Sequence, residues 1–160
     1  MKNFKKISKN KGFTLIEILV VIGIIAILAG IVLIAINPAR QFRQARNTQR
    51  ESNVNAILNA IGQFTADNKG ILPDEIDGTT GTFQDISSTG ADLCDGADSE
   101  LVSTYIPALP FDPDETVVDC IGASYDTGYQ VNKDANGRIT VRAIGEDLDG
   151  TGTMNIDVTR

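Results

Sequence analysis

Lys11-Gly12-Phe13-Thr14-Leu15-Ile16-Glu17 is followed by 19 residues, 18–36, that carry no charge. In a helix these 19 residues extend about 28 Å, because each residue adds about 1.5 Å. The hydrocarbon core of a bilayer is about 30 Å thick. The sequence therefore predicts a helix that crosses a membrane once.

Glu17 places an acidic side chain at the start of this apolar run. An acidic residue costs about 2.5 to 3.5 kcal/mol near the bilayer centre and less at a shallower depth. One interpretation is a simple anchor whose Glu17 side chain extends to the head groups. The alternative is that the carboxylate has a specific partner, which is the usual role of an ionisable residue in a membrane.

The segment Gly12-Phe13-Thr14-Leu15-Ile16-Glu17, after a lysine-rich leader, resembles the class III signal of type IV pilins and of type II secretion pseudopilins. The resemblance covers about residues 11–40. It implies that a prepilin peptidase cleaves between Gly12 and Phe13, that Phe13 is N-methylated, and that Glu17 supports assembly. The implied partners are other copies in a homo-oligomeric filament, an inner-membrane assembly platform and minor pilins.

Residues 1–12 contain five lysines and no acidic residue, and we interpret them as a leader peptide. The positive-inside rule holds this leader in the cytoplasm, with the helix spanning the cytoplasmic membrane and contacting lipid. An ordinary secretory signal requires a shorter apolar core and a small-x-small cleavage site, which this segment does not have. By the resemblance, the mature chain joins an extracellular pilus or a periplasm-spanning pseudopilus.

A second helical segment follows the apolar one. Pro38 lacks an amide hydrogen, so we expect a kink or a loosening of the helix around residues 34–38. Residues 39–68 are amphipathic, with one apolar stripe and with Asn53 among the polar residues expected to face away. Asn68-Lys69-Gly70 is a helix stop signal. The stripe consists of Val54, Ile57, Leu58, Ile61 and Phe64.

Four arginines lie on roughly one side of this second helix, at spacings of three and four residues. They are Arg40, Arg43, Arg46 and Arg50. Three interpretations compete: a solvated or head-group-facing collar, a stop-transfer signal, and partners for the acidic heads of neighbouring subunits.

Residues 70–160 form the expected globular head. They contain 18 acidic residues against four basic ones, a net charge of −14. We therefore expect no direct nucleic-acid binding by the head, because such binding depends on cationic side chains. Residues 70–125 are predicted to be mainly loop with brief helix or strand. Alternating residues predict a hairpin at 129–143 and a third strand at 154–158.

The expected fold class is α+β. A leader (1–12) precedes an assembly helix (13–38), an amphipathic helix (39–68) and the head (70–160). The amphipathic stripe is predicted to pack against a small C-terminal antiparallel sheet, as the resemblance to pilins also implies.

Cys94 and Cys120 are the two cysteines of the chain. In an exported chain, two cysteines most simply form one disulfide, and we predict this bond. The alternative is two buried thiols in a reducing environment. In many similar pilins the second cysteine lies near the C-terminus, whereas 40 residues follow Cys120 here.

Four acidic residues near the C-terminus suggest a calcium site: Glu146, Asp147, Asp149 and Asp157. Carboxylate oxygens on a glycine-containing loop suit calcium better than zinc. The alternative is a solvated acidic turn. We expect no other cofactor.

The chain has no histidine, which excludes a Ser/His/Asp triad and histidine-based zinc sites. With the resemblance to pilins, this exclusion leads us to expect a structural pilin subunit and not an enzyme. Alternatives with the same fold are a major pseudopilin and a minor or competence pilin. An alternative of another class is a signal-anchored domain that binds calcium or another ligand.

Overall fold

The computed structural model describes residues 12–77, 81–94, 101–115, 120 and 124–160. It divides into two compact units, Met1–Pro38 and Ala39–Arg160.

The first unit contains helix α1 (Leu15–Ile36). Thr14 caps its N-terminus, and none of its 22 residues is buried. An apolar helix that protein does not cover needs another apolar environment, since exposed apolar surface in water is unfavourable. Helix α1 is long and apolar enough to cross a membrane.

Helix α1 ends where the sequence predicts an interruption. Asn37 adopts the left-handed conformation with φ of 47°, and Pro38 begins helix α2 (Pro38–Asp67). Proline suits the first position of a helix, because the amide hydrogen that it lacks would have no intrahelical partner there. The expected break around residues 34–38 is thus confirmed as a break between two helices.

Helix α2 ends as its stop signal indicates. Lys69 and Gly70 have φ of 59° and 93°, and the Gly70 amide donates a 2.8 Å hydrogen bond to the carbonyl of Thr65. This bond satisfies a carbonyl that the end of the helix would otherwise leave without a partner.

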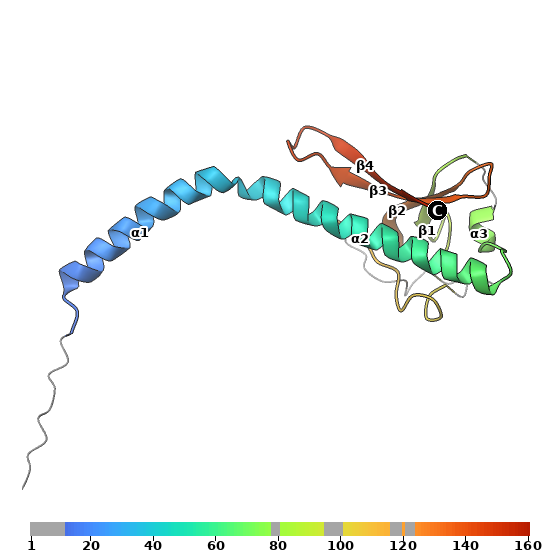
Figure 1. Cartoon of the computed structure of the whole chain (residues 1–160), viewed down its shortest axis with the longest axis horizontal. Helices are drawn as coiled ribbons and strands as arrows, with labels where there is room; N and C mark the ends of the chain where they lie inside the picture. The colour runs from blue at the N-terminus through green and yellow to red at the C-terminus, as the bar shows by residue number, and fades with distance from the viewer. Residues whose placement is uncertain (1–11, 78–80, 95–100, 116–119, 121–123) are drawn as a thin grey trace, which may run out of the picture. The chain divides into compact units, whose positions relative to one another are not determined.

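A four-stranded antiparallel sheet packs against α2 within the second unit (Figure 1). The strand order is β1 (Gln84–Ser87), β2 (Asp126–Lys133), β3 (Ile139–Glu146) and β4 (Thr153–Thr159). Val131 pairs with Val141, which in turn pairs with Val158. The predicted hairpin and third strand are confirmed. Strand β1 is additional, and it lies within residues 70–125, which were predicted to be mainly loop.

The core lies between this sheet and the apolar stripe of α2. All five stripe residues are buried, as predicted: Val54, Ile57, Leu58, Ile61 and Phe64. The chain between α3 (Asp74–Asp77) and β2 completes the core, since Ile106 and Leu109 are buried and the Tyr105 ring meets Phe64 edge to face at 5.6 Å. The α+β, pilin-like fold class is confirmed.

Candidate functional site

The predicted processing and assembly residues lie at the start of α1. Gly12 and Phe13 are exposed. Glu17 and Thr14 form a reciprocal capping box: the Glu17 amide donates to Thr14 Oγ1 at 3.3 Å, and the Thr14 amide donates to Glu17 Oε2 at 3.4 Å. The sequence analysis missed this box, although its signal, Thr-x-x-Glu before an apolar run, is visible in the sequence.

In the precursor, the Glu17 carboxylate is therefore hydrogen-bonded at the start of α1. The carboxylate satisfies an amide at the start of the helix, where anionic groups are also favoured by the helix dipole. Glu17 is therefore held at the N-terminal end of α1, within four residues of the expected new N-terminus at Phe13.

Arg50 connects α2 to the chain around Asp112. Its side chain is 3% exposed, and it donates to both carboxylate oxygens of Asp112, from Nε at 2.6 Å and from Nη2 at 2.8 Å. Nη2 also donates to Asp114 at 2.6 Å. The pKa of Arg50 is raised, mainly by the hydrogen bond to Asp112. A buried cation requires this compensation, because an unpaired charge away from water is strongly unfavourable.

Arg46 and Asn47 hold the end of β3 on α2. The Arg46 guanidinium binds the Glu146 carboxylate, and this interaction lowers the pKa of Glu146 to about 2. The Asn47 side-chain amide donates to the Glu146 carbonyl at 2.6 Å and accepts from the Glu146 amide at 2.9 Å. Helix α2 thus binds both the side chain and the backbone of Glu146.

Arg43 organises the turn between β3 and β4. Its Nη2 donates to the Leu148 carbonyl at 3.0 Å. Gly150 has φ of 74°, and a Cβ added there would lie 3.2 Å from Arg43 Cζ. The absence of a side chain at residue 150 therefore lets the turn lie against the guanidinium.

These contacts correct the interpretation of the arginines. Arg43, Arg46 and Arg50 bind groups of their own head, and are neither a solvated collar nor free partners for a neighbouring head. Arg40 is exposed. The spacing correctly placed the arginines on one side of α2, but it did not identify the side that faces the sheet.

Asn53 also corrects the sequence analysis. It was expected to face away from the core, but it is 8% exposed. Its Nδ2 lies 2.8 Å from the Tyr129 hydroxyl and 3.2 Å from the carbonyl of Phe111, and burial raises the pKa of Tyr129 to about 12. The first half of α2 thus packs on the head mainly through polar groups and the second half through apolar ones.

The four predicted calcium ligands are not gathered into one cluster. Glu146 is bound by Arg46 and Arg50, while Asp157 accepts from Arg142 at 2.7 and 2.8 Å. Arg142 lowers the pKa of Asp157. Within the described part of the chain, no group of three or more acidic, cysteine or histidine side chains can hold a metal ion. Calcium binding stays a prediction.

Cys94 and Cys120 are joined by a disulfide, with their Cα atoms 5.8 Å apart. Both side chains pack at the edge of the hydrophobic core. The predicted pairing is present in the structure.

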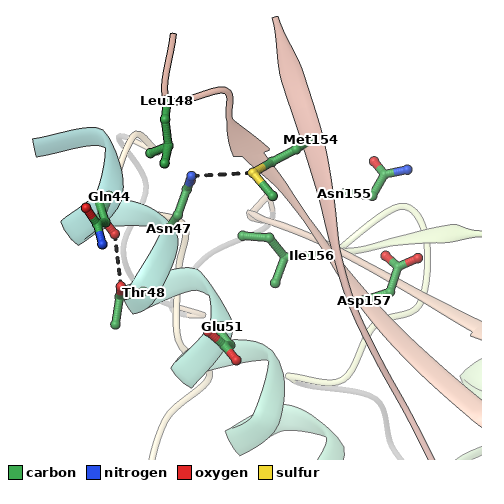
Figure 2. A pocket seen from close by; sticks show the side chains of 9 residues that line it. All are labelled: Gln44, Asn47, Thr48, Glu51, Leu148, Met154, Asn155, Ile156 and Asp157. Carbon is green, nitrogen blue, oxygen red and sulfur yellow. Dashed lines mark hydrogen bonds between the residues drawn. The ribbon is translucent and has the colours of Figure 1, made fainter. Parts of the chain in front are cut away.

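A cleft of about 420 Å³ lies between α2 and β4 (Figure 2). Its apolar lining comes from Leu148, Met154 and Ile156, and Figure 2 shows amide and carboxylate side chains around them. Asn47 Nδ2 lies 3.8 Å from the Met154 sulfur across the cleft. The lining offers hydrogen-bonding groups but no nucleophile paired with a base.

The comparisons identify the N-terminal region. Residues 7–33 match the family model of the prokaryotic N-terminal methylation motif. The chain carries a class III signal. This signal is typical of type IV pilins and pseudopilins, and with the α+β fold it makes the chain pilin-like. No curated protein and no solved structure matches the chain. The motif and the apolar helix α1 fit a membrane-anchored pilin-like protein.

Proposed function

We propose that the chain is a structural pilin subunit, processed by prepilin peptidase and polymerised into a type IV pilus-like filament. The observation that carries the proposal is the methylation motif at residues 7–33, which includes most of the apolar helix α1. Cleavage between Gly12 and Phe13 and N-methylation of Phe13 then produce the mature subunit. The partners are the peptidase, an assembly platform in the inner membrane, minor pilins and further copies of the chain.

Glu17 has the central role in this proposal. Cleavage creates an amine at Phe13, four residues before Glu17, so each mature subunit carries one positive and one negative group near the same membrane depth. In a medium of low dielectric constant such groups attract strongly. In a staggered polymer, Glu17 of one subunit pairs with the Phe13 amine of the next and so sets the axial register.

The test is filament assembly by Glu17→Gln and Glu17→Ala at equal subunit levels. We expect both variants to insert into the membrane and to be cleaved, because the apolar span is unchanged, and to yield few or no sheared filaments. Thr14→Val is the matched control, because it removes the capping hydroxyl and keeps the carboxylate. Normal filament yield from Glu17→Ala would show that apolar packing alone drives polymerisation.

A pseudopilin of a type II secretion system has the same processing and the same fold, and so does a minor or competence pilin. Cell fractionation separates these roles. A long surface pilus is sheared from cells, whereas a pseudopilus stays in the envelope and a minor pilin is present in few copies. In each case the role is structural and not enzymatic, and the motif supports it without distinguishing among them.

A further inference from the structure

Phe42 is a large apolar side chain that the head does not cover. It is 65% exposed, whereas Phe64 on the same helix is 9% exposed. Exposure of an aromatic ring to water is unfavourable, because the ring has a large apolar surface. A single exposed apolar residue is common in soluble proteins, so the position of Phe42 decides its significance.

Phe42 continues the face of α2 that packs on the head. The steps from residue 42 to residues 46, 50, 53, 57 and 64 are three, four or seven residues, which keeps all of them on one helical face. From Arg50 onward this face is buried under the sheet and its loops. Phe42 therefore has the orientation of a core residue but lies before the part of α2 that the head covers.

Phe42 also lies close to the membrane along the chain. It follows the last residue of α1, Ile36, by six residues, which even a fully extended chain spans in about 20 Å. Within α2, Phe42 is about 6 Å along the helix from Pro38. The head-group region adds about 5 to 8 Å to each side of the hydrocarbon core. Phe42 is thus within reach of the boundary between acyl chains and head groups.

The charges near Phe42 also favour contact with lipid head groups. Arg40 is exposed two residues earlier, and a guanidinium suits lipid phosphate. The head, residues 70–160, carries a net charge of −14, so a membrane with anionic lipids attracts the segment around Arg40 and repels the head. Phenylalanine on the apolar face and arginine on the polar face are typical of helices that lie at a membrane interface.

We infer that Phe42 is an interfacial anchor, whose ring inserts between lipid head groups while the subunit is in the membrane. This inference rests on the proposed membrane-anchored function. Because six residues join Ile36 to Phe42, anchoring at Phe42 limits how far the C-terminal end of α1 can lie from the interface.

The chain has no tryptophan, so Phe42→Trp introduces a single fluorescent reporter at the proposed anchor. The full chain is reconstituted into vesicles of phosphatidylethanolamine and phosphatidylglycerol, with and without bromine on the acyl chains. The matched control is Ile71→Trp, because Ile71 is 63% exposed but lies beyond the far end of α2.

We expect the emission of Phe42→Trp to shift to shorter wavelength in vesicles and to be strongly quenched by brominated lipid. The Ile71→Trp emission should stay at the wavelength of water-exposed tryptophan and lose little intensity. Short-wavelength emission at residue 42 without bromine quenching would overturn the inference, because a second copy of the chain would then cover the ring.

Water-like emission at residue 42 in a chain that floats with the vesicles would also overturn the inference, and would leave the proposed function intact. A chain that does not float with vesicles would contradict both the anchor and the membrane-anchored function. Equal quenching at residues 42 and 71 would show that the head lies on the bilayer as a whole, which contradicts a specific anchor at Phe42.

Discussion

Arg50 on α2 and Asp112, 62 residues later in the chain, form a buried bidentate ion pair, with Nε–Oδ2 at 2.6 Å and Nη2–Oδ1 at 2.8 Å. Their side chains are 3% and 9% exposed. The pair connects the polar half of α2 to the chain that precedes β2. Neither partner can be removed without leaving the other charge buried.

Substitution of Arg50 by Met should therefore destabilise the head strongly. Removing one partner of a buried ion pair costs about 3 to 5 kcal/mol. The measurement is urea unfolding of the full chain in detergent, followed by the fluorescence of the three tyrosines, which all lie in the head. The control is Arg138→Met, because Arg138 pairs with Asp134 but is 64% exposed, and exposed pairs contribute little. Equal losses of unfolding free energy in the two variants would show that burial does not make the Arg50–Asp112 pair more important for stability than an exposed pair.

Glu146 predicts how the stability of the head depends on pH. Its pKa is lowered from 4.5 to about 2, chiefly by the hydrogen bond from Arg46. The folded state thus favours the ionised carboxylate, and the resulting stability is fully present above pH 4.5. It should be lost as the pH falls from 4.5 to about 2.

Glu146→Gln isolates this contribution. The variant cannot change its charge at residue 146, so its free energy of unfolding should fall less steeply than that of the unaltered chain between pH 4.5 and 2. The measurement is urea unfolding at several pH values. Parallel curves for the two proteins over this interval would show that the Arg46–Glu146 pair does not contribute.

The disulfide should stabilise the head against unfolding. The cysteines are 26 residues apart, and the chain-entropy model gives about 3 to 4 kcal/mol for a loop of this length. We expect the double variant Cys94→Ser, Cys120→Ser to unfold at lower urea concentration. In native material, neither thiol should be alkylated unless reductant is added; alkylation of both without reductant, detected by mass spectrometry, would disprove the pairing.

Calcium binding is testable on the same chain. A ligand at a hundred times its dissociation constant stabilises the folded state by about 2.7 kcal/mol. Arg46 and Arg142 hold Glu146 and Asp157, so protection by calcium should depend on Asp147 and Asp149 and be lost in Asp147→Asn, Asp149→Asn. A melting temperature that is the same in calcium and in chelator would remove the calcium hypothesis.

The apolar periodicity of the chain predicted most of the fold. Val54 and Phe64 lie in the core because a helical stripe must be covered, and Val131 pairs with Val141 because alternation specifies a strand face. Such patterns depend on near neighbours in the sequence. The existence of β1 was not predictable in this way, because its four residues are too few to show a period.

The polar contacts between α2 and the head were not predictable from the sequence. Arg50 and Asp112 are far apart in the chain, and no local pattern marks them as partners. The apolar stripe assigns the polar Asn53 to the solvent side, because the Tyr129 hydroxyl that Asn53 binds is distant in the sequence. The acidic turn suggested calcium by composition, whereas Arg43 and Arg46 of the same chain bind this region in the structure. The Thr14–Glu17 capping box is different, since its signal is local and was available.

If the chain is a processed, polymerising subunit, its N-terminal peptide must have the mass of a cleaved and methylated chain. Material sheared or extracted from the native membrane is digested, and the N-terminal peptide is analysed by mass spectrometry. We expect a peptide that begins at Phe13 and carries one methyl group on its amine. Assembled material whose chain still contains Met1 to Gly12 would contradict processing by prepilin peptidase.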